Sequence, residues 1–151
     1  MKRQRSSEKG QILVIFVFAL IALLGFTALA IDGGMLFTDR RFSQAAADAS
    51  SLAGAGAAAH LLEDYGIEWS RFSCTAFHGN QAQKAAYTTA KSRGASNAFS
   101  DLDNNLSDNH GIKVSCVNDV HLFDKHIDVQ TKITSQVSTA FIHLFFAGDV
   151  K

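Results

Sequence analysis

Apolar residues are distributed unevenly along the chain, and one continuous apolar run dominates its first part. The run extends from Ile12 to Ile31, reads ILVIFVFALIALLGFTALAI and contains no charged residue. A helix of this length rises 1.5 Å per residue and extends about 30 Å, which is the thickness of a bilayer's hydrocarbon core. We therefore predict a transmembrane helix at residues 11–32.

The charges that flank this run predict its orientation. Residues 1–10 carry four basic residues and one acid, whereas Asp32 is the first charge beyond the run. The positive-inside rule then predicts a cytoplasmic basic leader at 1–10 and an extracytoplasmic domain at 33–151. The alternative is a secretory signal peptide cut near Ala30. A signal peptide's apolar core is shorter, about 7–15 residues, so a retained anchor is favoured.

Small residues follow the apolar run at helical spacing. The pattern from Met35 to Leu62 predicts that the helix continues, with Gly66 as its stop. A row at i, i+4 spacing predicts a smooth stripe on which another helix or a sheet can pack closely. An exposed alanine helix is the alternative, but Gly54 and Gly56 add nothing to an exposed helix. The stripe consists of Ala45, Ala49, Ala53 and Ala57.

The second half of the chain predicts a short helix and two strands. Asn80 is the expected N-cap of a helix at 81–93, with Gly94 just past its end. Apolar and polar residues alternate at 112–117 and 127–134, as in half-buried strands. We expect these strands to pair antiparallel across a connection of about eight to ten residues, with the alanine-rich helices covering their apolar face. Apolar residues at helical spacing from Phe141 to Phe145, with Gly148 as a stop, predict either one further short helix at 141–148 or an apolar patch for a partner.

The fold class that these elements predict is α+β. A long N-terminal helix, with a transmembrane half and an alanine-rich soluble half, packs on a small antiparallel sheet with one or two short helices.

Charge and cysteine content narrow the classes of function. The 14 basic and 14 acidic residues balance, so nothing favours a nucleic-acid partner. The two cysteines, Cys74 and Cys116, can form one disulfide if this part of the chain faces an oxidising compartment. Two free thiols remain the alternative.

Candidate catalytic and metal-binding patterns fail on spacing. His121 and His126 are five residues apart, which suits neither a helical nor a strand zinc pair. The chain has no glycine-rich phosphate loop, and no serine or cysteine stands in a recognisable nucleophile motif. We therefore expect no catalytic residue, no metal site and no cofactor, and predict that the protein is not an enzyme.

Two groups of motifs resemble a known family. The first comprises Lys9-Gly10-Gln11, the apolar run, Ile31-Asp32-Gly33-Gly34, Arg40-Arg41 and Gln44-Ala45-Ala46-Ala47-Asp48-Ala49. The second, which is weaker, comprises residues 127–131, 138–141 and 146–148. Together they resemble the TadE/TadG-like proteins of Flp (tight-adherence) pilus assembly, in particular the N-terminal TadG-like region.

The resemblance implies a pilin-like fold and a structural role in the bacterial inner membrane. The chain would be a single-pass, pseudopilin-like component of a machine used in cell adhesion. Its partners would be the lipid bilayer, other pilus-assembly or pilin-like proteins, and further copies of itself. In related prepilins a peptidase cuts after a glycine, and the matching bond here joins Gly10 and Gln11. Ile15 stands where type IV pilins carry glutamate, which places the chain nearer the TadG-like branch.

An alternative function is a membrane-anchored extracytoplasmic binding or sensing module unrelated to pili. Its recognition surface would lie in residues 65–125, and a ligand pocket lined by Trp69 and Phe72 would favour it.

Overall fold

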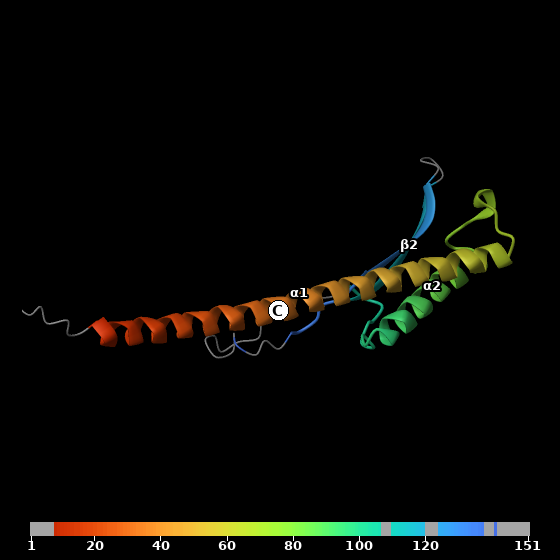
Figure 1. The fold of residues 1–151 in the computed structure, drawn as a ribbon. Coiled ribbons are helices and arrows are strands. Elements are labelled where there is room, and N and C mark those ends of the chain that lie inside the picture. Colours follow the sequence, from red (N-terminus) through yellow and green to blue (C-terminus); the bar gives the residue numbers. More distant parts are fainter. Residues whose placement is uncertain (1–7, 107–109, 120–123, 138–140, 142–151) are drawn as a thin grey trace, which may run out of the picture. The chain divides into compact units, whose positions relative to one another are not determined.

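The computed structural model describes residues 8–106, 110–119, 124–137 and 141 of the chain (Figure 1). Helix α1 spans Glu8–Asp64, the 3-10 helix η1 spans Trp69–Arg71, and helix α2 spans Phe77–Ser96. Strands β1 (Gly111–Asp119) and β2 (Asp124–Lys132) form a two-stranded antiparallel sheet. The fold is thus α+β, as predicted.

The chain divides into two compact units. Unit 1 consists of residues 1–39 and 136–151, and unit 2 consists of residues 40–135. Unit 1 contains the apolar part of α1, which continues as helix through Gly33 and Gly34. Within it Asp32 is fully buried, and its carboxylate accepts a hydrogen bond from the backbone N–H of Phe141 at 3.0 Å. The short helix predicted at 141–148 lies, except for Phe141, outside the described residues.

Helix α1 ends in a motif that glycine makes possible. Gly66 has φ +60°, in the left-handed region where a side chain is unfavourable. Its N–H donates to the carbonyl of Glu63, and the N–H of Ile67 donates to the carbonyl of Leu62. These two bonds satisfy carbonyls that the end of the helix leaves without an intrahelical partner. Gly66 is therefore the stop that the sequence predicted.

Helix α2 is longer at both ends than predicted. It begins at Phe77 after the N-cap Ala76, so Asn80 lies inside the helix, where its side chain donates to the carbonyl of Thr75 instead of capping. Gly94 also lies inside the helix and is buried. A Cβ at position 94 would collide with the side chain of Leu102. Gly94 therefore permits close packing of the following segment and does not end the helix.

The two strands pair in one continuous register from Gly111 opposite Lys132 to Asp119 opposite Asp124. The connection is therefore residues 120–123, shorter than expected, because both strands extend further into it. The alternation places apolar side chains of both strands on the face toward the helices, as predicted. Val114, Ile127 and Val129 pack there against the buried alanines Ala58, Ala82 and Ala86.

A second cluster completes the core of unit 2. Ala90, Leu102 and Ile112 are fully buried and contact Tyr87, Phe99, Val114, Val129 and Ile133. Leu102 belongs to the segment between α2 and β1. A hydrogen bond also connects this segment to α2. Lys91 donates a hydrogen bond to Asp103 at 3.3 Å, and this bond raises the pKa of the Lys91 ammonium above its usual value.

Candidate functional site

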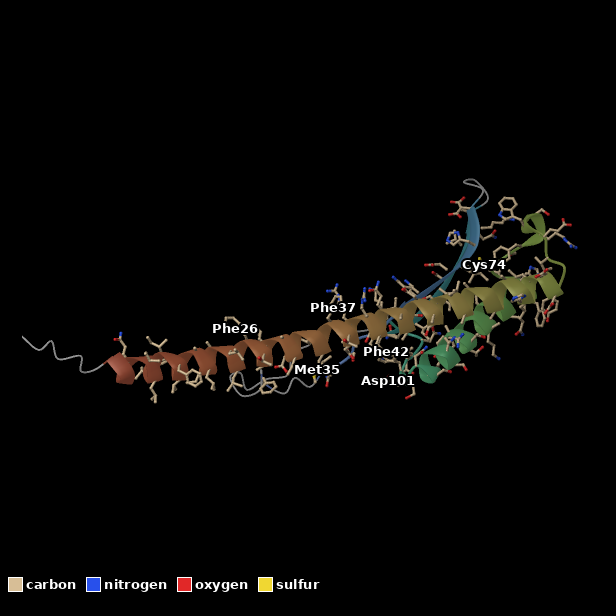
Figure 2. The ribbon with its side chains drawn as sticks, viewed as in Figure 1. Phe26, Met35, Phe37, Phe42, Cys74 and Asp101 are labelled. Atoms are coloured by element: carbon tan, nitrogen blue, oxygen red, sulfur yellow. A yellow bond between two sulfur atoms is a disulfide. The ribbon has the colours of Figure 1, made fainter. Side chains whose placement is uncertain are left out.

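The apolar part of α1 is the first candidate surface. Its side chains are exposed on all sides, from Ile12 (66 %) to Phe26 (74 %). Figure 2 shows Phe26, Met35 and Phe37 projecting outward from the helix. A helix that is apolar around its whole circumference is either buried in a protein core or surrounded by lipid. This one is not buried within the protein, and it is long and apolar enough to cross a membrane.

Gly10 and Gln11, the residues of the predicted cleavage bond, lie in α1 and are exposed. A Cβ at Gly10 would have no other heavy atom within 4 Å. Cleavage after Gly10 remains a prediction.

The buried row of α1 in unit 2 differs from the expected stripe. Ala45 is exposed, and Ala49, Ala53 and Ala57 are half-buried. The residues that face the core lie one position further along the chain: Ala46, Ser50, Gly54 and Ala58. Gly54 is the point of closest approach, since a Cβ there would lie 2.7 Å from the carbonyl oxygen of Ala86 in α2. Helix α1 therefore packs on α2 and β2 through this row.

Cys74 and Cys116 are joined by a disulfide. Cys74 lies in the segment between η1 and α2 and is labelled in Figure 2, while Cys116 lies in β1 on the core face. The bond therefore attaches the segment that follows α1 to the sheet.

A pocket of about 230 Å³ is the second candidate site. Its walls come from three parts of unit 2: α1, the segment that carries η1, and β2. The wall is mostly apolar, and the only tryptophan of the chain, Trp69, stands in it half exposed beside buried Phe72. The other lining residues are Ala55, Ala58, Ala59, Leu62, Ile67, Lys125, His126 and Ile127. A concave apolar site with few polar groups is the usual form of a ligand or peptide site.

Lys125 holds the η1 segment against the sheet. Its ammonium lies 4.9 Å from the centre of the Trp69 ring and donates to the carbonyls of Trp69, Ser70 and Phe72 at 3.3–3.5 Å. These carbonyls belong to the end of η1, where a cation is favoured by the exposed C=O groups. The Lys125 charge is thus satisfied within the protein.

We expect Lys125→Met to loosen this segment. The substitution keeps the apolar stem but removes the three hydrogen bonds and the cation–π contact, which together contribute on the order of 1–2 kcal/mol. Trp69 emission should shift to longer wavelength, and denaturation followed by that emission should begin at lower denaturant. Lys113→Met is the matched control, because Lys113 is an exposed strand lysine outside the pocket. Equal emission spectra for the two variants would contradict this role.

A further polar pair, His126 and Asp124, lies beside the pocket. His126 lies at the pocket and its Nδ1 is 2.7 Å from a carboxylate oxygen of Asp124, while His121 lies outside the described residues. In the described part of the chain no group of three or more histidine, cysteine, aspartate or glutamate side chains could hold a metal ion.

Comparison with known proteins gives one match. The model of the TadE/G-like Flp pilus-assembly family matches residues 10–59, about a third of the chain. The matched region begins at Gly10, contains the whole apolar run and ends in the part of α1 that packs in unit 2. No curated protein and no solved structure matches the chain. The resemblance predicted from the first group of motifs is confirmed for residues 10–59, which are similar to the TadE/G-like Flp pilus-assembly family.

Proposed function

We propose that the protein is a membrane-anchored, TadG-like structural component of a pilus-assembly machine. The observation that carries the proposal is the coincidence of the family match at 10–59 with the long apolar part of α1. The N-terminus lies in the cytoplasm of a bacterial cell, the helix crosses the inner membrane, and residues 33–151 lie outside. The protein acts by packing against other proteins and not by catalysis.

Two surfaces of α1 are available for this packing. The first is the apolar segment, on which lipid and the helices of other pilus proteins compete. The second is the exposed side of α1 in unit 2, opposite the buried row, where Leu52 is 76 % exposed among alanines that include Ala45, Ala55 and Ala59. Small residues let helix backbones approach closely. Self-association or association with a pilin-like helix uses this side.

Prepilin-type processing belongs to the same proposal. The basic leader, the exposed Gly10 and the apolar segment that follows are what such a peptidase requires in related prepilins. Cleavage between Gly10 and Gln11 would leave Gln11 as the mature N-terminus.

Intact mass before and after protease treatment of spheroplasts tests orientation and processing together. The mass from untreated membranes should lack residues 1–10. External protease should then leave a membrane-embedded fragment that starts at the mature N-terminus and has lost the soluble domain. A fragment that keeps the soluble domain and loses the N-terminus would contradict the orientation. A full-length mass would contradict processing alone.

The pocket supports a second candidate function. Trp69 and Phe72 both line it, as expected for an anchored extracytoplasmic binding module. Such a module would bind its ligand without any pilus protein present, whereas the first function requires one. Co-purification from native membranes with and without the other pilus proteins separates the two.

A further inference from the structure

The outer edge of β2 carries main-chain groups that, within the part of the chain that the structure describes, lack partners. In an antiparallel pair, alternate residues direct their N–H and C=O groups away from the other strand. The N–H of Thr131 points outward, because it donates to Ser51 Oγ at 3.1 Å. Opposite it the N–H of Ile112 also points outward, toward the carbonyl of Asp103. The alternation therefore directs the main-chain groups of Ile127 and Lys125 outward too.

Among the residues that the structure describes, the outward main-chain groups of Ile127 and Lys125 have no hydrogen-bond partner. An unpaired strand edge is a template for pairing with another extended chain. The edge near Thr131 differs, since Ser51 of α1 satisfies its donor. The part of β2 nearer Asp124 is open in this way.

Helix α1 lies beside β2, but a space remains between them where this open edge begins. It contacts the strand at Ser51 and at Gly54, where an added Cβ would lie 3.0 Å from Val129 Cγ1. Beside these contacts a pocket lies between the two elements, with Ala55, Ala58, Ala59 and Leu62 on the helix side and residues 125–127 on the strand side. The apolar pocket and the open strand edge are thus parts of one site.

We propose that this site binds a short extended segment of a partner polypeptide. The segment's main chain pairs with Lys125 and Ile127, and one of its apolar side chains enters the pocket between Trp69, Ile67 and Leu62. Main-chain pairing supplies affinity in such strand addition, and the side-chain pocket supplies specificity. The proposal deepens the proposed function, on which it rests for the partner being a protein.

The chemistry of the site favours a polypeptide over a small apolar molecule. An extended chain offers donors and acceptors in the alternation that the strand edge requires, whereas an apolar molecule would leave those groups unpaired. The volume of about 230 Å³ suits one large apolar side chain with the adjoining backbone. The side chain that enters is uncharged, because the Lys125 ammonium already has three carbonyl partners.

A peptide titration of the whole chain in lipid nanodiscs tests the proposal. The probe is a capped peptide of alternating threonine and leucine. Trp69, as the only tryptophan, reports on the pocket, and hydrogen exchange reports on the amide of Ile127. We expect a saturable change in Trp69 emission together with slower exchange at Ile127. The absence of both at millimolar peptide would overturn the proposal.

Two comparisons separate strand addition from simple filling of the pocket. Ala59→Phe fills the pocket from an exposed helix position and should weaken binding about tenfold or more, whereas Ala95→Phe, exposed on α2 and outside the pocket, should not. A peptide methylated on its backbone nitrogens cannot donate main-chain hydrogen bonds. It should bind the unmodified protein as weakly as the parent peptide binds the Ala59→Phe variant. Equal binding of methylated and parent peptides would overturn strand pairing, and so would an equal response to a short fatty alcohol. Failure here leaves the protease experiment unaffected, because that experiment reads only the ends of the chain.

Discussion

Loss of the Cys74–Cys116 disulfide is expected to lower the free energy of unfolding of unit 2 by about 3–4 kcal/mol. The two cysteines are 42 residues apart, so the bond removes much of the unfolded chain's freedom. It also attaches the segment between η1 and α2 to the core face of β1. Unit 2 is small, its buried core is built largely from alanine, and few other large side chains are fully buried. A single covalent link is therefore a large share of its stability.

Denaturant titrations of the whole chain in detergent, followed by Trp69 emission, measure this effect. The oxidised protein, the protein with reductant, and the variant Cys74→Ser/Cys116→Ser should be compared. The last two should unfold at the same, lower denaturant concentration, and reductant should have no effect on the double variant. A midpoint that is identical in oxidised and reduced protein would contradict the prediction.

Gly54→Ala is expected to destabilise unit 2 by about 1–3 kcal/mol, although alanine is the better helix former. An added Cβ would lie 2.7 Å from a backbone carbonyl of α2 and 3.0 Å from both Ala90 and Val129. A backbone oxygen cannot move aside by changing rotamer, so α1 and α2 must separate. Separation would open the core along the buried row of α1.

Gly56→Ala provides the matched control, two residues along the same helix. A Cβ at position 56 has no other heavy atom within 4 Å. Alanine there should stabilise the protein by about 0.5–1 kcal/mol through helix propensity alone. The two substitutions are chemically identical and should change the denaturation midpoint in opposite directions. A rise for both would show that α1 and α2 are not in close contact at Gly54.

The long apolar helix and the hairpin could be predicted because each has a strong periodic or continuous apolar pattern. The run from Ile12 to Ile31 is too long and too apolar for any element but a membrane helix or a deeply buried one. The alternation at 112–117 and 127–134 fixes which side chains share a face, since a slip of one residue would invert the strand. The covered face of the sheet followed from it.

The packing face of α1 could not be predicted to the residue. Alanine occurs at positions 45–47, 49, 53, 55 and 57–59, so a row of small residues can be drawn along several sides of the helix. Large apolar residues normally fix the phase of a helix, and here Leu52, which would do so, is 76 % exposed. The neighbours in space, not the helical period, decide that Ala46, Ser50, Gly54 and Ala58 face inward.

The pocket was anticipated in its aromatic residues but not in its walls. Trp69 and Phe72 lie in a segment without a clear period, where only the presence of aromatic residues favours a pocket. Ala55, Ala59 and Lys125 come from distant parts of the sequence, and no local signal joins them. The prediction that Gly94 lies just past the end of the helix is wrong for a related reason. A glycine suits both a helix stop and a close approach of another segment.

The hydrogen bond between Asp32 and Phe141 has a consequence for the order in which the protein is assembled. Unit 1 is discontinuous, and all of unit 2 is inserted between its two parts. During synthesis the first part of unit 1 therefore emerges first, unit 2 next as one continuous stretch, and the residues that complete unit 1 last. Domains fold as units in the order of synthesis. The hydrogen bond from the Phe141 N–H to Asp32 can therefore form only after residues 40–135 have been synthesised, so unit 1 closes after unit 2 is complete.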